Sequence, residues 1–163
     1  MIVVGIDPGL SGAIAILENN KVLNIFDMPV MAEGKKNKRQ LNSAQLVSII
    51  KDSTKPDAEI AVVVEQVNAM PGQGVTSMFN FGQTFGAIKG VCAALELPIF
   101  FVRPSKWKKH FELINSSKDA SRTKVIEMYP SLSNQLTRKK DVNKTDAILI
   151  ARYYVETRLR DKN

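Results

Sequence analysis

Two nearly uninterrupted apolar runs, each followed directly by an acid, constrain the fold of this chain most strongly. The first is IVVGI at residues 2–6, which precedes Asp7, and the second is IAVVV at 60–64, which precedes Glu65. Short runs of this kind are typical of buried strands, and the second predicts a central parallel strand. Because the carboxyl ends of neighbouring parallel strands meet at one edge, we expect both acids to project into one crevice.

The rest of the chain predicts a sheet flanked by helices. The length of 163 residues fits one domain, spanning 1–163. The expected class is α/β, with a mixed five-stranded sheet of three antiparallel strands followed by parallel strands. We expect further strands at 12–17, 22–28 and 99–102 and a polar loop at 29–41. We expect a helix that begins after Asn42 and runs through Ile50, and further helices at 75–96, 105–110, 118–129 and 144–159.

Composition indicates the cellular location of the protein and the class of partner that it binds. The single Cys92 cannot form an internal disulfide, which favours a reducing, cytoplasmic location. No apolar run is long enough to cross a bilayer, so we expect no membrane association. The net charge of +7 fits either a soluble protein with a basic surface or a polyanion-binding protein.

The paired acids indicate metal chemistry. Two carboxylates held close together repel each other unless a cation lies between them, and oxygen ligands alone suit Mg²⁺ or Mn²⁺. Asp7 has an alternative role, because an Asp before Pro8-Gly9 commonly caps a turn through its own backbone. Both interpretations remain open from this site alone.

A third acid, Asp146, shares one face of the last predicted helix with Leu149, Ile150 and Tyr153. It is therefore a candidate metal ligand. The alternative is a helix cap, because the segment from Asn143 to Asp146 has the spacing of a capping box. Asp141 and Asn143 also fit either role.

A basic segment from residue 103 to 124 predicts contacts with nucleic-acid phosphates. Its cations are Arg103, Lys106, Lys108, Lys109, Lys118, Arg122 and Lys124. Such a run also fits a solvated surface. Trp107 interrupts the run, where it can either stack on a base or pack its helix against the core.

The chain resembles the RuvC family of Holliday-junction resolvases from residue 2 to about 155. The resemblance rests on GIDPGLSGAIAI at 5–16, VVVEQV at 62–67 and NKTDAILIA at 143–151. SMFNFGQTFGAIKGV at 77–91 resembles the dimerisation helix of the family. RPSKWKKHF at 103–111 and SSKDASRTKV at 116–125 resemble its DNA-contacting segments.

The resemblance implies a ribonuclease H-like fold, a homodimer and incision of branched double-stranded DNA, the four-way junction, in recombination and repair. Its catalytic acids would be Asp7, Glu65 and Asp146, and we expect two Mg²⁺ ions, or Mn²⁺, with Asp7 between them. The alternatives are another ribonuclease H-like nuclease, acting on branched DNA or RNA–DNA hybrids, and a junction-binding protein with impaired catalysis.

The chain departs from the family pattern at two positions. Asn143 stands where the family usually has a fourth ligand, Asp or His, so either Asn143 or Asp141 is the candidate fourth ligand here. Asn68 stands where many members carry an aromatic residue that enters the junction. Met70 is the candidate substitute for that residue.

Overall fold

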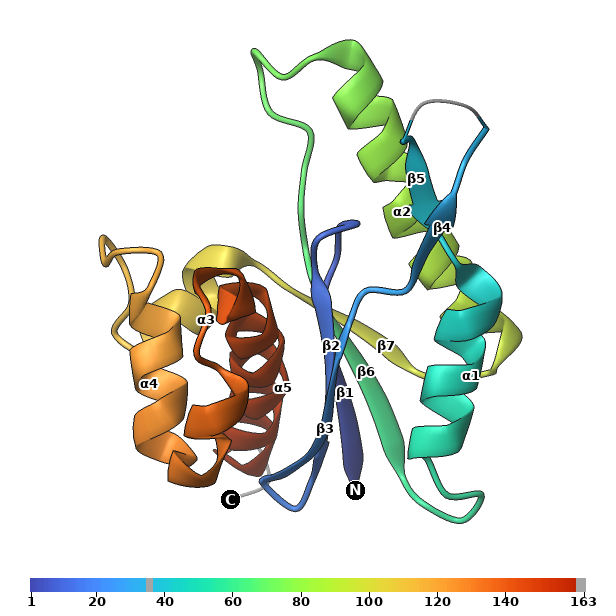
Figure 1. Cartoon of the computed structure of the whole chain (residues 1–163). Helices are drawn as coiled ribbons and strands as arrows, with labels where there is room; N and C mark the ends of the chain where they lie inside the picture. Colours follow the sequence, from blue (N-terminus) through green and yellow to red (C-terminus); the bar gives the residue numbers. More distant parts are fainter. Residues whose placement is uncertain (35–36, 161–163) are drawn as a thin grey trace.

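The computed structural model describes residues 1–34 and 37–160, and a five-stranded mixed sheet forms its centre (Figure 1). The strand order is β3-β2-β1-β6-β7. Neighbours among β1, β2 and β3 pair antiparallel, whereas β6 pairs in parallel with both β1 and β7. The strands are β1 (Ile2–Asp7), β2 (Ala13–Glu18), β3 (Lys21–Asp27), β6 (Ile60–Glu65) and β7 (Ile99–Val102). The sheet predicted from the sequence is confirmed.

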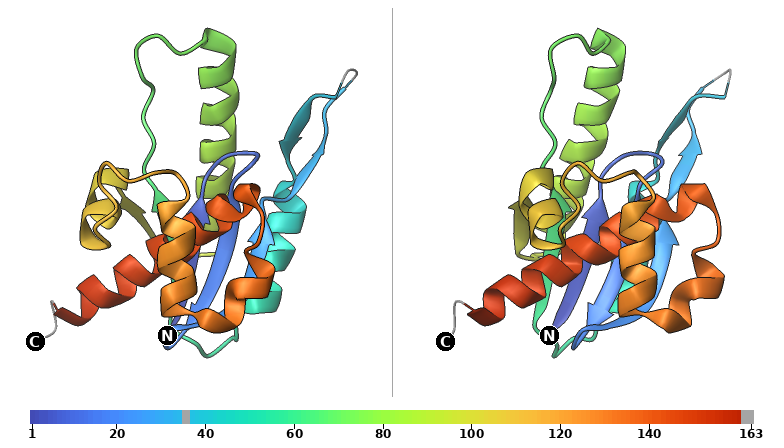
Figure 2. Two further views of the ribbon diagram at one scale, coloured as in Figure 1. Left: turned by 60° about the vertical axis from the view of Figure 1, so that its left-hand side comes forward. Right: turned by 90° about the vertical axis from the view of Figure 1, so that its left-hand side faces the viewer.

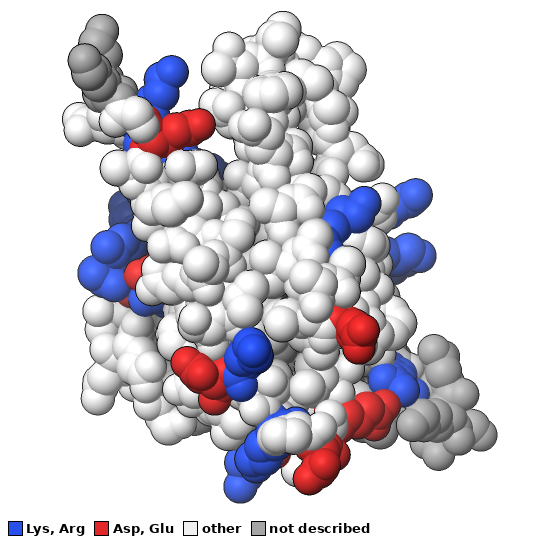
Figure 3. Space-filling view, turned by 90° about the vertical axis from the view of Figure 1, so that its right-hand side faces the viewer, with Lys and Arg blue, Asp and Glu red and all other residues white. Residues whose placement is uncertain are grey.

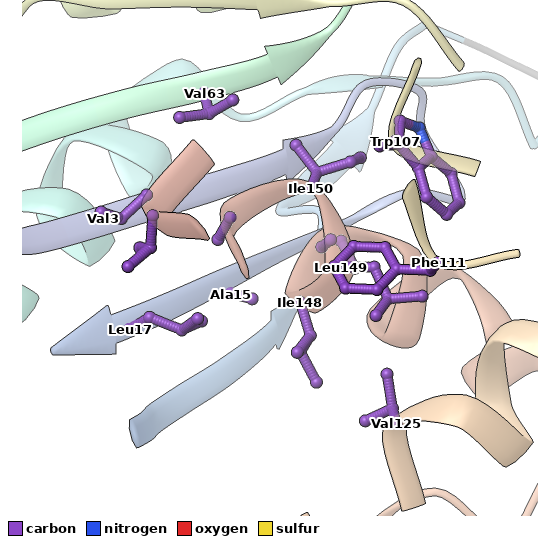
Figure 4. Close-up of a cluster of buried hydrophobic side chains, with 14 of the residues drawn as sticks. Val3, Ala15, Leu17, Val63, Trp107, Phe111, Val125, Ile148, Leu149 and Ile150 are labelled. Atoms are coloured by element: carbon purple, nitrogen blue, oxygen red, sulfur yellow. The ribbon is translucent and has the colours of Figure 1, made fainter. Parts of the chain in front are cut away.

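Helices cover both faces of this sheet, so two cores form. On one face lie α1 (Ser43–Ser53) and α2 (Val75–Ala94); on the other lie α3 (Pro104–His110), α4 (Ala120–Met128) and α5 (Val142–Arg160) (Figure 1). Two 3-10 turns, Pro130–Gln135 and Lys139–Asp141, link α4 to α5. Alternate side chains of β1 enter different cores: Val3 faces α5, whereas Ile2 and Val4 face α1 and α2. Figure 4 shows the core on the α5 side.

One element differs from the expectation. Segment 29–41 contains a two-stranded antiparallel hairpin, β4 (Val30–Ala32) and β5 (Arg39–Leu41), rather than a loop alone. Its strands are three residues long, too short for a recognisable alternation of apolar and polar positions. Leu41 anchors the base of the hairpin in the core. The hairpin projects past the sheet beside α2 (Figure 2).

No helix in the described part of the chain is both long and apolar enough to cross a membrane.

Candidate active site

Asp7 and Glu65 lie at the carboxyl ends of adjacent parallel strands, as expected. β1 and β6 pair up to Ile6 and Val64, so the two acids are the next residues along each strand. Both side chains are partly buried. The loop that follows β6 and the amino-terminal half of α2 extend beyond this edge of the sheet (Figure 1).

Asp146 reaches the same edge because α5 packs directly on β1. A Cβ atom at Gly5 would lie 2.2 Å from the carbonyl oxygen of Ala147 and 2.8 Å from the Cβ of Ala151. Glycine therefore permits the close approach of helix and strand that places Asp146 beside the end of β1. The structure thus brings the three predicted catalytic acids together.

Negative charges link the acids electrostatically, since Asp7 is affected by Glu65 and Asp146, and Glu65 is affected by Asp146. Burial, reinforced by the charges of Glu65 and Asp146, raises the pKa of Asp7 to about 8. Burial also raises the pKa of Glu65 and that of Asp146 above their ordinary values. A carboxylate cluster of this kind is costly to ionise fully unless a cation compensates it.

Two side chains of α3 complete the site. The indole Nε1–H of Trp107 donates a hydrogen bond to Oε2 of Glu65 at 2.6 Å, and Trp107 is 1% exposed. Trp107 therefore packs in the core and does not stack on a base. Lys108 lowers the pKa of Asp7, Glu65 and Asp146, so its ammonium acts on all three acids. In the sequence nothing distinguishes Lys108 from the neighbouring lysines.

The residues of this site fit a hard divalent cation by their chemistry. Every side-chain donor of the three acids is an oxygen, as Mg²⁺ and Mn²⁺ prefer. Across the described residues, no group of three or more His, Cys, Asp or Glu side chains is already arranged to hold an ion. Because the three carboxylates are not yet arranged as ligands, we expect their side chains to rotate when an ion binds.

Asp141 occupies a different network from the three acids. Its buried carboxylate accepts hydrogen bonds from the backbone N–H of Arg138 at 2.8 Å and from Nη2 of Arg138 at 3.1 Å, and Lys144 lies 3.4 Å away. Burial would raise the pKa of Asp141, but Arg138 and Lys144 together hold it below its usual value. Asp141 therefore caps the 3-10 turn Lys139–Asp141 that precedes α5. The structure does not support it as a metal ligand.

Asn143 lies beside the β1–β2 loop. Its Nδ2 donates to the carbonyl oxygen of Ser11 at 2.6 Å. The capping box considered as the alternative role of Asn143 and Asp146 does not form, because α5 already begins at Val142. Asp146 is therefore an interior residue of the helix and not its cap. The role of Asn143 as a fourth ligand stays a prediction.

Replacing Asp141 with Asn should destabilise the fold without changing the metal requirement of any activity. The change removes a charge bonded to Arg138 and Lys144, for which we expect a loss of about 2 kcal/mol in the free energy of unfolding. Urea denaturation measures that loss. A higher Mg²⁺ midpoint for activity in the folded Asp141→Asn variant would instead place Asp141 at the metal.

The predicted DNA-contacting cations divide into two groups. Arg103, Lys106, Lys109 and Lys118 are exposed, and Lys124 is half-buried on α4. Arg122 is engaged within the protein: its guanidinium pairs with both carboxylate oxygens of Asp119, at 2.7 and 2.8 Å, and reaches the carbonyl oxygen of Leu136 at 3.1 Å. We therefore assign Arg122 a structural role, whereas the others stay predictions.

Met70 lies in the loop between β6 and α2. It is 60% exposed, and its backbone N–H donates to Oε1 of Gln73 at 3.2 Å. Asn68 is also exposed and lines an apolar groove with Met78, Phe81 and Phe85 of α2. The position of Met70 fits a residue that enters DNA, and this role stays a prediction.

The raised pKa of Asp7 predicts an unusual pH dependence of stability in metal-free protein. Between its ordinary value of 3.8 and about 8, Asp7 keeps its proton in the folded state and releases it in the unfolded state. The free energy of unfolding should therefore fall as pH rises through this window, by about 1.4 kcal/mol for each unit of pKa difference at most. Thermal unfolding in EDTA from pH 4 to 9 measures the slope, which Asp7→Asn should reduce. An equal slope in both proteins would contradict the assignment.

Comparison with known proteins identifies the fold. No protein-family model and no curated protein matches the sequence. Among solved structures, Thermus thermophilus RuvC in complex with a Holliday junction substrate has a TM-score of 0.66 and 16% identity, covering 96% of each chain. A second T. thermophilus RuvC structure has a TM-score of 0.57 and 18% identity, again covering 96% of each chain. The fowlpox virus Holliday junction resolvase has a TM-score of 0.53 and 18% identity, covering 96% of this chain and 99% of that one. The chain therefore has the ribonuclease H-like fold of these resolvases.

Proposed function

We propose that this protein is a divalent-metal-dependent endonuclease that resolves four-way DNA junctions by paired phosphodiester hydrolysis. The observation that carries the proposal is the convergence of Asp7, Glu65 and Asp146 on one edge of the sheet, with Lys108 beside them. The fold supports the same conclusion, since it is shared along nearly the whole chain with proteins that act on Holliday junctions.

The three acids would hold the metal ions, which supply an activated water and stabilise the leaving oxygen when bound. Trp107 fixes the orientation of Glu65 through its Nε1–H. Lys108 supplies a positive charge within the field of all three acids, where it would stabilise the negative charge that develops on the scissile phosphate. The exposed cations of the 103–124 segment would hold the phosphates of the DNA arms.

A homodimer is part of the proposal, because one face of α2 has no partner among the residues that the structure describes. Six residues at spacings of three or four share this face, which we call the α2 face, and all are exposed: Val75, Phe79, Gly82, Gly86, Gly90 and Ala93. No atom lies within 4 Å of a Cβ built at any of the three glycines. In Figure 3 the surface over α2 is largely free of charged side chains.

The α2 face suits the helix of a second copy. Phe79 is 66% exposed and Val75 is 85% exposed, which is costly for large apolar side chains in water. Glycines repeated every four residues allow two helix backbones to approach closely. A two-fold dimer would present two identical active sites to a junction that has approximate two-fold symmetry.

Substituting Gly86 with Leu should convert the dimer into a monomer. In an isolated helix this change is favourable, since glycine is destabilising by about 0.8–1 kcal/mol relative to Ala in a helix interior. Sedimentation velocity measures the oligomeric state, and Asn80→Leu is the matched control, since Asn80 is exposed on the same helix but lies outside the α2 face. The Gly86→Leu monomer should nick junctions without paired incision. A dimer that persists in Gly86→Leu would exclude the α2 face as the interface.

Cleavage of three labelled substrates tests the proposed activity. With Mg²⁺, the protein should incise a four-way junction at symmetric positions and should cut a linear duplex and an RNA–DNA hybrid far more slowly. Preferred cleavage of the hybrid would indicate a different ribonuclease H-like nuclease. Tight junction binding without incision, with Mg²⁺ or Mn²⁺, would indicate a junction-binding protein.

A further inference from the structure

The short helix α3 carries two side chains of the site, and its orientation therefore decides the geometry there. It spans seven residues, and Trp107 and Lys108 occupy its middle. Trp107 and Phe111 anchor it in the core on the α5 side. Apolar contacts are not directional, so they leave the rotation of a helix this short weakly defined.

His110 supplies the directional contact between α3 and α5. Its Nε2 lies 2.6 Å from Oε2 of Glu156, and the two side chains are 12% and 27% exposed. The imidazole also packs edge-on against Phe111 and Tyr153, with ring centroids 4.7 and 5.2 Å apart. His110 lies three residues after Trp107, on the same side of the helix.

Glu156 is itself fixed from its other side. Its Oε1 accepts a hydrogen bond from Nε of Arg152 at 2.5 Å, one turn earlier on α5. Nη1 of Arg152 in turn donates to the hydroxyl of Tyr129, at the end of α4, at 3.4 Å. Although burial opposes it, bonding to His110 and Arg152 holds the pKa of Glu156 below its ordinary value. The carboxylate thus presents one oxygen to α3 from a rigid position on α5.

We propose that His110 and Glu156 are positioning residues for the active site: their bond fixes the rotation of α3, which aims the Trp107 indole at Glu65 and directs Lys108 toward the three acids. Neither residue contacts the acids, so their effect is transmitted through α3. The consequence for catalysis rests on the proposed nuclease function, whereas the consequence for Trp107 does not.

The chain offers a direct optical probe, because Trp107 is its single tryptophan. Its fluorescence reports the indole bonded to Glu65 without contributions from elsewhere. In His110→Ala, acrylamide should quench Trp107 at least about twofold more efficiently than in wild type, measured well below the unfolding temperature. His110→Gln retains a donor that reaches Glu156 and should restore most of the protection. Ser105→Ala, at an exposed position on the same helix, is the control and should behave as wild type.

Activity supplies the second readout. His110→Ala should lower kcat for junction cleavage about tenfold, the effect expected for one hydrogen bond to a charged group, with little change in KM for the DNA. His110→Gln should recover most of that loss. If His110→Ala does not fold, Glu156→Gln provides the test: it keeps the size of the side chain and its bond to Arg152 but loses the charge, and should shift quenching and kcat less, in the same direction.

Unchanged Trp107 quenching in a folded His110→Ala or Glu156→Gln protein would overturn the proposal. Equal losses in His110→Ala and His110→Gln would also overturn it, since they would show that the bond to Glu156 is not the cause. If no variant or wild-type protein cleaves junctions, the proposed nuclease function fails. The quenching experiment still decides whether His110 positions Trp107.

Discussion

Replacing Asp7 with Asn should reduce the rate of junction cleavage by a factor of at least about 1000, because it removes a charged ligand from the centre of the acidic cluster. Junction binding should stay equal or become stronger, since the basic side chains proposed to contact phosphates are unchanged and no positive charge is lost. Single-turnover cleavage and gel-shift titration measure the two quantities separately. Glu65→Gln should behave in the same way.

A matched control separates this effect from the general loss of one acid. Asp57 lies in an exposed turn before β6, so Asp57→Asn should leave both cleavage and binding unchanged. Cleavage by Asp7→Asn within tenfold of the wild-type rate would remove Asp7 from the mechanism. A parallel loss of binding and cleavage would instead indicate that the substitution disturbs the fold.

Lys108→Met should have the second-largest effect, a loss of about 100-fold in kcat with a small change in DNA affinity. The reason is the placement of Lys108, whose charge acts on all three acids and, in the proposed mechanism, would stabilise the charge that develops during hydrolysis. Its ammonium also lies 5.3 Å from the centre of the Trp107 ring, which restrains it near the site. Rates under saturating DNA, compared with binding constants, separate the two contributions.

Lys109 provides the control for this prediction, since it is the next residue but exposed. Lys109→Met should weaken binding to every form of DNA and reduce the salt dependence of binding by about one unit of slope, while kcat changes little. Identical behaviour of the two variants would mean that Lys108 is only another phosphate contact.

The sequence predicted the sheet and the acidic cluster because both depend on local patterns. The apolar runs that end at Asp7 and Glu65 define two central strands, and the edge shared by parallel strands brings the acids together. Asp146 could be placed from its helical spacing relative to Leu149 and Ile150. The fold expected from the resemblance is confirmed by the structural comparison.

Other features depend on contacts between distant parts of the chain and were not visible in the sequence. Arg122 and Lys108 look alike as members of one basic run, yet Arg122 pairs with Asp119 whereas Lys108 faces the acids. The bond from Trp107 to Glu65 joins residues 42 positions apart. Asp141 could not be distinguished from a ligand until its network with Arg138 and Lys144 was known.

The central claim is that Asp7, Glu65 and Asp146 together hold the divalent ions that cut branched DNA. Anomalous diffraction from crystals of the wild-type protein with Mn²⁺ and a four-way junction that carries an uncleavable phosphate analogue tests it most directly. We predict Mn²⁺ peaks within bonding distance of all three carboxylates and of the scissile phosphate, and their loss in Asp7→Asn. Mn²⁺ bound elsewhere, or a junction whose phosphates lie far from these acids, would contradict the account.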